Sequence, residues 1–326
     1  MDLNLNPATI TLATFHTLLG AYETTVRQRT RTKALLQSKP KSISTSSAKK
    51  TKQIGKRAAP PAKDAEEAQE EHAENLDLVD AQAREFLDLD GWRYKGLPDL
   101  IEKRRAGKDG GERGGYLSKD ELVRLMEWKL KHGVYRPTLL GMVRQNPEKT
   151  VSSATASAFS SLSSLAGSIE AAETALSTLT APLRGVGAAT ASLVLSVACR
   201  DVPFYSDDVF LWLCVGVYPP HSSSTKGSKE VKPNGELNVK YNVAEYRRLW
   251  EGVQGLRKRL NEGVEEGKEV SCCDVEKVAL VIRRFGQSGL GAQDEAGEQD
   301  EEKEETKESG GSGEDGRRKR RKIRSA

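Results

Sequence analysis

The chain has 326 residues, of which 37% are hydrophobic and 30% are charged, and its formal net charge is +4. We expect no membrane-spanning helix, because no run of about 18 apolar residues occurs. The four cysteines form no CxxC pair and the four histidines are scattered. The sequence therefore predicts neither a disulfide framework nor a metal site.

The first 75 residues are predicted to form an arm in front of the folded domain. Apolar residues recur at helical spacing within 8–37, which indicates a helix. Residues 38–75 are rich in Ser, Lys, Ala, Pro and Glu. This composition cannot offset the entropy lost on ordering, so we expect a disordered linker there. The N-terminal helix of the 1–75 arm is thus expected to be separate from the main domain.

The main domain is predicted over residues 76–292. Ser118 and Glu121 have capping-box spacing, which predicts a helix that ends near Gly133. Further helices are expected at 76–90, 97–105, 138–145, 151–164, 168–180, 188–199, 206–215, 243–261 and 273–285. Residues 218–240 are rich in Ser, Lys, Gly and Pro and indicate a flexible insertion. Alternating apolar patterns are nearly absent, so the predicted fold class is all-α.

The C-terminal tail, residues 293–326, is predicted to be disordered. Its sequence is first acidic, then Gly-rich, and ends in the basic octamer RRKRRKIR at 317–324. Such an octamer at an exposed end is typical of a signal that the nuclear import machinery binds, or of a nucleic-acid-binding arm. A solvated tail without either role is the alternative. The position of the octamer favours nuclear import, so we expect a nuclear protein.

The most informative segment is 183–191, with the sequence LRGVGAATA. Its Gly-Val-Gly turn lies between two apolar helical patterns, and glycines permit positive φ and close approach of another backbone. Amides at the N-terminus of the second helix favour a phosphate oxygen, so the turn is predicted to hold a nucleic-acid backbone without reading sequence. An ordinary turn between two helices is the alternative. The candidate DNA-binding residues are Gly185, Val186, Gly187, Ala188 and Thr190.

The full pattern resembles the helix-hairpin-helix DNA glycosylase superfamily, which contains endonuclease III and MutY-like enzymes. Within it, the chain is most similar to the Amun-like nuclear proteins, through this hairpin, MEWKLKHGVYRP at 126–137 and VPFYSDD at 202–208. In this superfamily a catalytic Asp lies 22 residues after the first hairpin Gly, and Asp207 has this spacing from Gly185. The resemblance implies a helix-hairpin-helix glycosylase fold over 76–292 and a role in base excision repair.

Asp207 is the candidate catalytic residue, with Asp208 as the fallback. Cleavage of an N-glycosidic bond develops positive charge on the sugar, which a nearby carboxylate stabilises once the base has been flipped out of the stack. The alternative is that one of the two aspartates caps the following helix. Bifunctional members of the superfamily carry a hairpin Lys that forms a Schiff base, and Ala189 stands at that position here. The resemblance therefore implies a monofunctional enzyme, unless another amine substitutes.

No cofactor is expected, because the four-Cys iron–sulfur loop of some members is absent after Cys273. Eight basic residues are weaker candidates for binding the phosphates of a DNA backbone. Each is equally well explained as part of a helix face that is exposed to solvent. They are Lys129, Lys131, Arg136, Arg247, Arg248, Arg257, Lys258 and Arg259.

The sequence thus predicts a nuclear DNA-binding protein related to base-excision glycosylases. If the protein is an enzyme, the prediction is a monofunctional N-glycosylase whose catalytic residue is Asp207. Whether the chain is an enzyme stays open at this point. One alternative is a non-catalytic scaffold that docks on DNA or chromatin, and another is a protein-interaction module that retains the fold. The nearly balanced charge of the main domain favours these alternatives, because phosphate neutralisation supplies much of the affinity for DNA.

Overall fold

The structure is a computed structural model, and it describes residues 3–38, 62–107, 114–133, 136–164, 168–219 and 228–290. Its helices are α1 (Leu12–Gly20), α2 (Tyr22–Ser38), α3 (Ala62–Gly91), α4 (Leu97–Arg105), α5 (Lys119–His132), α6 (Pro137–Arg144), α7 (Glu148–Ser164), α8 (Ile169–Thr180), α9 (Ala188–Ala198), α10 (Asp207–Phe210), α11 (Val243–Leu260) and α12 (Cys272–Arg283). They are joined by the π-helical turns η1 (Trp92–Gly96) and η2 (Leu211–Val215) and the 3₁₀ turn η4 (Phe285–Gln287). Within these ranges the β structure is one isolated bridge, so the predicted all-α class is confirmed. No helix in the described ranges is long and apolar enough to cross a membrane.

Side-chain caps fix where several helices begin. The Ser118 hydroxyl accepts from the backbone N–H of Glu121, and the Glu121 side chain accepts from the Ser118 N–H, as the capping-box spacing predicts. Two later helices, α11 and α12, begin with the same reciprocal arrangement, at Asn242 and Ser271. Each box satisfies backbone donors that the first turn of a helix leaves without partners.

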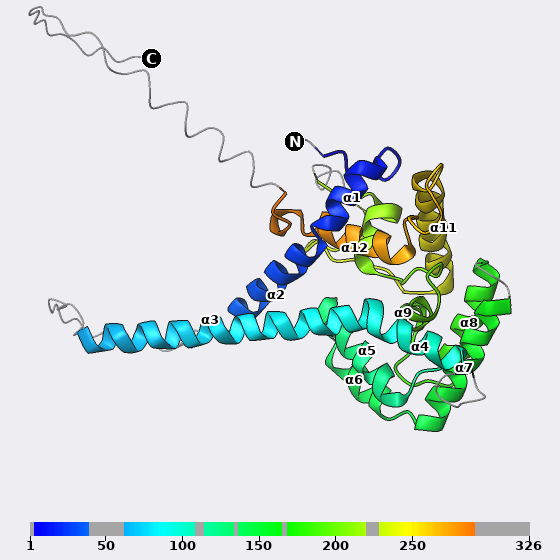
Figure 1. Ribbon diagram of the computed structural model, residues 1–326, viewed down its shortest axis with the longest axis horizontal. Coiled ribbons are helices and arrows are strands. Elements are labelled where there is room, and N and C mark those ends of the chain that lie inside the picture. The colour runs from blue at the N-terminus through cyan, green and yellow to red at the C-terminus, as the bar shows by residue number, and fades with distance from the viewer. Residues whose placement is uncertain are drawn as a thin grey trace, which may run out of the picture. The chain divides into compact units, whose positions relative to one another are not determined.

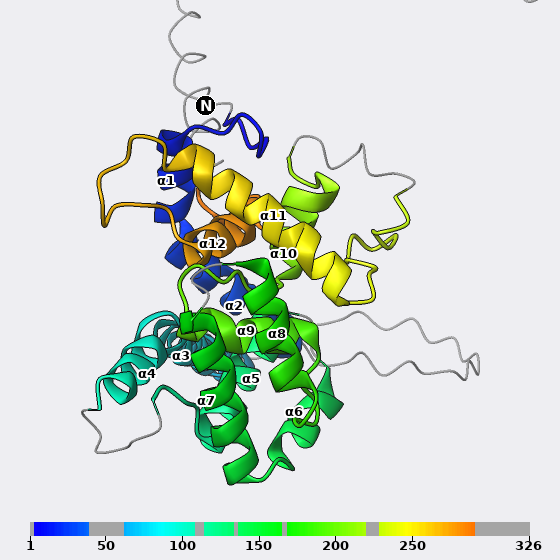
Figure 2. The same cartoon turned by 90° about the vertical axis from the view of Figure 1, so that its right-hand side faces the viewer.

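The central helix of the described fold is α9. Residues 189–198 are all buried, which explains why this stretch is apolar or small on every side. Figure 2 shows α9 between α4–α8, which form one group of helices, and α1, α10, α11 and α12, which form another. The start of α9 lies where the two groups meet, because residues 187–190 line a cavity together with residues of α5 and of the end of α12.

The N-terminal helices belong to the core, so the expectation of a separate arm is wrong for residues 3–38. Ile10, Phe15 and Leu18 are fully buried, and α1 packs against α12. Helix α2 runs alongside α3 (Figure 1). Helix α3 itself begins at Ala62, inside the stretch expected to be a linker. The periodic apolar residues of the N-terminus thus mark a face that is buried against the rest of the fold.

A buried polar cluster ties these helices together. Asp90, at the end of α3, accepts hydrogen bonds from the Trp128 indole of α5 at 2.8 Å and from the Tyr22 hydroxyl of α2 at 3.1 Å. Arg93 of η1 forms a buried ion pair with Glu276 of α12, with 2.7 Å between Nη2 and Oε2. Each of these groups has a partner from a distant segment, so the cluster fixes how α2, α3, α5 and α12 pack.

The expected flexible insertion, 218–240, is partly ordered. Residues 228–240 form a turn with backbone hydrogen bonds of 2.8 Å, and Leu237 is buried against the core. This part lies at the surface, as expected, but Leu237 anchors it to the core and the backbone bonds give it a defined turn. Residues 220–227 and the tail from 293, with its basic octamer at 317–324, lie outside the described residues.

Candidate functional site

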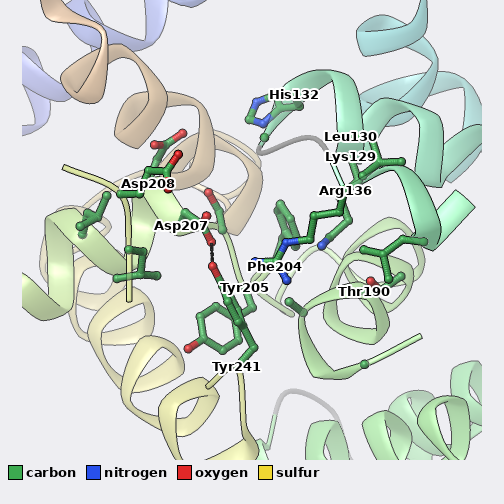
Figure 3. A pocket seen from close by; sticks show the side chains of 18 of the residues that line it. Lys129, Leu130, His132, Arg136, Thr190, Phe204, Tyr205, Asp207, Asp208 and Tyr241 are labelled. Atoms are coloured by element: carbon green, nitrogen blue, oxygen red, sulfur yellow. Dashed lines mark hydrogen bonds between the residues drawn. The ribbon is translucent and has the colours of Figure 1, made fainter. Parts of the chain in front are cut away.

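A cavity of about 380 Å³ lies where the two helix groups meet, and Figure 3 shows the side chains that line it. This volume falls in the range of small-molecule sites, about 300–1,000 Å³. Its walls come from α2, α5, the start of α9, residues 204–208, residues 236–241 and the end of α12. The cavity thus brings the hairpin turn, residues 183–187, and Asp207 to one site.

The two hairpin glycines have different roles. Gly185 has φ +76°, and a Cβ there would lie 3.0 Å from the Met142 Cβ and 3.3 Å from the Leu139 carbonyl oxygen. Only glycine fits this turn against α6. Gly187 has φ −93°, and a Cβ there would meet nothing within 4 Å. The space above Gly187 is open, so the chain's own packing does not require glycine at this position.

Asn146 holds the hairpin turn against the end of α6. Its Oδ1 accepts from the Arg184 N–H at 2.8 Å, and its Nδ2 donates to the carbonyls of Arg184 and Val143, both at 2.9 Å. The side chain is buried, with 1% of its surface exposed. Because Asn146 both donates to and accepts from Arg184, the turn is fixed in one orientation.

The start of α9 presents backbone amides to the cavity. Gly187 is the N-cap residue, and no side chain caps this end of the helix. Amides without partners at a helix N-terminus favour an anion. Of the five candidate DNA-binding residues, Gly185, Gly187, Ala188 and Thr190 line the cavity. Val186 packs its side chain into the hydrophobic core, so only its backbone could take part in the predicted phosphate site.

The carboxylate of Asp207 is turned into the cavity. Oδ1 accepts a hydrogen bond of 3.0 Å from the Tyr241 hydroxyl. Asp207 is the first residue of α10, and the N-cap residue Ser206 forms no side-chain capping bond. The interpretation of Asp207 as a helix cap therefore does not match its contacts. Burial raises the pKa of Asp207, whereas the hydrogen bond from Tyr241 and the charge of Lys129 lower it.

The segment before Asp207 is held on both sides. The Tyr205 N–H donates to the Ser192 hydroxyl of α9 at 2.9 Å, and the Tyr246 hydroxyl of α11 donates to the Pro203 carbonyl at 3.0 Å. The Tyr205 hydroxyl also donates to Glu245 at 3.2 Å. These bonds anchor the loop to two helices, so Asp207 is fixed relative to the hairpin turn.

Asp208 lies in a different environment. Figure 3 shows it on the far side of Asp207 from Thr190 of α9, and its positively charged neighbours are Arg29, Arg283 and Arg284. Burial raises the pKa of Asp208, and the positive charge of Arg29 lowers it. The two neighbouring carboxylates therefore face different groups. Asp207 faces Tyr241 and the open cavity, and Asp208 faces a cluster of arginines.

Basic residues outnumber acidic residues around the cavity, although the two types are nearly balanced over the whole chain. Its acidic lining residues are Asp207, Asp208 and Glu236. Its basic lining residues are Arg29, Lys129, Arg136, Lys240, Arg283 and Arg284. Of these, only Lys129 and Arg136 were predicted from the sequence. Arg29 was missed because α2 was expected to be separate, whereas Arg283 and Arg284 carry no signal beyond a basic helix end.

Several other basic candidates are already paired. Arg247, Arg248 and Arg257 of α11 form ion pairs with acidic groups of neighbouring segments, at 2.6–2.8 Å. Lys131 forms an ion pair of 2.7 Å with Glu85. These side chains hold helices together, so a phosphate track along α11 is not supported by their contacts.

Across the described ranges, no cluster of His, Cys, Asp or Glu could hold a metal ion, and the four cysteines are free thiols. No family model matches the chain, and neither the curated proteins nor the solved structures include one that matches it. The resemblance to helix-hairpin-helix glycosylases therefore stays a prediction from the sequence motifs.

Proposed function

We propose that this protein binds DNA and holds one nucleotide in the cavity with its sugar beside Asp207, as a monofunctional N-glycosylase does. One observation carries the proposal: a single cavity contains both the uncapped amides of the hairpin turn and the carboxylate of Asp207. The sequence motif suggested both parts and their spacing along the chain. Their placement around the same cavity is what a glycosylase requires, because it must hold the DNA backbone while a carboxylate acts on the sugar of one nucleotide.

The chemistry of the walls supports this assignment. The amides at the start of α9 and the cationic lining suit phosphate groups on either side of a nucleotide. Phe204, Tyr205 and Tyr241 supply aromatic surfaces, and the rings of Tyr205 and Tyr241 lie 5.3 Å apart between centroids. Aromatic side chains of this kind stack on a base that has left the helix.

Asp207 is suited to stabilise a sugar cation. It must be ionised to do so, and its partners favour ionisation: the Tyr241 hydroxyl donates to it, and the charges of Lys129 and Arg136 act on it. Burial opposes ionisation, so the carboxylate is held in a weakly solvated site where its charge acts strongly on a nearby cation. The resemblance to helix-hairpin-helix glycosylases adds support for this role of Asp207. Nuclear import through the basic octamer stays a prediction.

The proposal is tested with a mimic of the transition state. The full chain is titrated with duplex DNA in which a cationic pyrrolidine replaces one nucleoside sugar, and with the matched plain duplex at the same salt concentration. We expect a preference of at least about 100-fold for the pyrrolidine, as transition-state analogues show. Asp207→Asn removes the negative charge beside the sugar and should abolish the preference. Asp88→Asn, on the exposed face of α3, is the matched control and should retain it.

Each other result selects a different function. Equal binding to both duplexes overturns the glycosylase and leaves a DNA-docking scaffold. No binding to either duplex leaves a protein-interaction module. A preference that survives Asp207→Asn but is lost in Asp208→Asn would move the catalytic role to the neighbouring carboxylate.

A further inference from the structure

Helix α2 carries basic residues on two opposite faces, and the two faces differ in their partners. Arg27 and Arg31 form ion pairs of 2.7 Å and 2.8 Å with carboxylates of α2 and α3. Arg29 and Lys33 lie four positions apart, so they share the other face. Among the described residues, no carboxylate forms an ion pair with either of them. Because like charges at this spacing repel each other, this face of α2 stays cationic at a cost to the helix.

Arg284, at the end of α12, adds a third positive charge beside this face of α2. Helices α2 and α12 pack against each other. Burial lowers the pKa of Arg29 and the charge of Arg284 lowers it further, whereas the carboxylate of Asp208 raises it. Burial and the charge of Arg29 also lower the pKa of Lys33. Arg29, Lys33 and Arg284 therefore act on one another and form a single cationic surface.

The positive charge of the cationic surface is not balanced within the described part of the chain. Asp208 is one carboxylate that faces three arginines, among them Arg29 and Arg284. Arg29 and Lys33 donate to the backbone carbonyls of His132 and Lys131, the second at 3.4 Å. A carbonyl accepts a hydrogen bond but does not neutralise a cation. The surface thus keeps a net positive charge that an external anion would stabilise.

The position of the cationic surface indicates what kind of anion it suits. Arg29 and Arg284 line the cavity, and Lys33 lies about one turn further along α2, beyond the lining residues. The surface therefore begins in the cavity and continues out of it. The uncapped amides at the start of α9 line the same cavity. A row of cations that continues from one phosphate-binding point suits a strand with a charge on every nucleotide better than one small anion.

We propose that Arg29, Lys33 and Arg284 bind phosphates of a DNA strand that leaves the cavity across α2 and the end of α12. The N-terminal helix α2 is then part of the DNA interface as well as of the packed fold. The inference rests on the proposed function, because it takes DNA as the ligand of the cavity. It adds a second phosphate-binding surface that the motifs in residues 183–208 do not indicate.

The test measures the affinity of the full chain for a plain DNA duplex as a function of salt concentration. The slope of log K against log salt concentration decreases in magnitude by about 1 for each phosphate contact that is lost. The double variant Lys33→Ala with Arg284→Ala should therefore lower the slope by about 2 and weaken binding at least about tenfold near 0.1 M salt. Both side chains are exposed, so urea unfolding should show the stability of the wild type.

The double variant Arg27→Ala with Arg31→Ala is the matched control. It also removes two positive charges from α2, but from the face on which both arginines are paired with carboxylates. The control should keep the slope of the wild type, because charges more than about 10 Å from a phosphate are largely screened at this salt concentration. An equal loss of slope in both double variants would show a general effect of net charge and would overturn the inference.

Neutral phosphates locate the contact on the DNA. Single phosphates near the pyrrolidine are replaced in turn by uncharged methylphosphonates, and each duplex is titrated with the wild type and with the Lys33→Ala, Arg284→Ala variant. A phosphate that contacts the cationic surface should matter for the wild type and have little effect on the variant. If each replacement weakens the two proteins equally, these side chains do not contact the strand.

The results also separate this inference from the proposed function. If the double variant binds DNA as the wild type does and the pyrrolidine preference is intact, the inference fails and the glycosylase proposal stands. The cationic surface would then suit an acidic protein partner instead. If the double variant loses slope and affinity but the wild type does not prefer the pyrrolidine, the surface stands and the glycosylase proposal fails. A wild type that binds neither duplex overturns both.

Discussion

The indole N–H of Trp212 donates a hydrogen bond of 2.9 Å to the backbone carbonyl of Leu5, 207 positions earlier in the chain. Trp212 lies in η2, directly after the short helix that begins with Asp207. Arg259 of α11 binds the same N-terminal segment by donating to the carbonyls of Pro7 and Ile10. The first residues of the chain are therefore in direct contact with the part of the fold that positions the candidate catalytic carboxylate.

Deletion of residues 1–38 is expected to prevent cooperative folding. It would expose the surfaces covered by Phe15 and Leu18, and each such side chain contributes about 1.5–3 kcal/mol when buried. The fully buried side chains of the deleted segment, Ile10, Phe15, Leu18 and Val26, together contribute about 6–12 kcal/mol, which is comparable to the whole stability of a typical domain, about 5–15 kcal/mol. Urea unfolding followed by circular dichroism measures the effect. Trp212→Phe, which removes one hydrogen bond, should cost only about 1 kcal/mol. A truncated chain that unfolds at the wild-type urea concentration would contradict this account of the core.

Alanine at the two hairpin glycines should have opposite consequences. Gly185→Ala should destabilise the fold by about 1–3 kcal/mol, because φ is +76° and the new Cβ would press on Met142. Gly187→Ala should cost less than about 1 kcal/mol, the effect of alanine at an N-cap position. Its methyl group would nevertheless stand where a phosphate is proposed to approach. DNA affinity should therefore fall about tenfold, the equivalent of about 1.4 kcal/mol.

Urea unfolding and DNA titration of both glycine variants check this pair of expectations. Each variant serves as the control for the other, because Gly185→Ala should mainly lower stability and Gly187→Ala should mainly lower DNA affinity. If Gly187→Ala left DNA affinity unchanged at equal stability, the amides of the hairpin turn would not be a phosphate site.

Tyr241→Phe should move the acidic limb of the pH–rate profile toward higher pH. The Tyr241 hydroxyl donates to the ionised form of Asp207 and so lowers its pKa, while burial raises it. Without the hydroxyl, the carboxylate takes up a proton at a higher pH, and a reaction that needs the ionised form is lost earlier on acidification. Single-turnover rates of base removal between pH 4 and pH 8 give the midpoint. Tyr116 does not line the cavity and its ring contacts Arg104, so Tyr116→Phe should leave the midpoint where it is.

Asp207→Asn should raise the melting temperature at pH 7 even though it removes activity. The pKa of Asp207 is raised in the folded chain, so the fold binds the proton more tightly than the unfolded chain does. Ionisation above both pKa values therefore costs folding free energy, and below the unfolded pKa this cost is absent. The amide removes the charge and with it the cost. Calorimetry at pH 7 and at pH 3 measures the effect, which should be clear at pH 7 and vanish at pH 3.

What the sequence predicts correctly is mostly local. The Ser118–Glu121 capping box depends on neighbouring residues, and the structure has it where the pattern indicated. The bounds of the helices from Leu97 onward also agree closely with the pattern, whereas α3 begins at Ala62 rather than near 76, and the single helix expected within 8–37 is the two helices α1 and α2. The proximity of Asp207 to the hairpin turn follows from one intervening helix, α9. Arg29 in the cavity is different, since it requires α2 to pack against the core. No local pattern encodes that contact, and the linker-like composition between α2 and α3 argued against it.

Tyr241 illustrates the same limit within the site. It directly follows the polar stretch 218–240 that predicts a flexible insertion, and its hydroxyl contacts Asp207. Leu237 is the reason, because one buried apolar residue holds the loop against the cavity. A single anchor of this kind has no periodicity, so pattern analysis does not detect it.

The side chain of Asn146 fixes the hairpin turn, and the residue after it is Pro147. Asparagine amides decay over time when the nitrogen of the following residue attacks the side-chain carbonyl, and proline has no N–H with which to do so. Deamidation would also turn two donated hydrogen bonds into carboxylate–carbonyl repulsion. The Asn146-Pro147 sequence therefore protects the hydrogen bonds between Asn146 and the hairpin turn from loss by deamidation. A molecule that has existed for a long time keeps the same turn geometry as a newly made one.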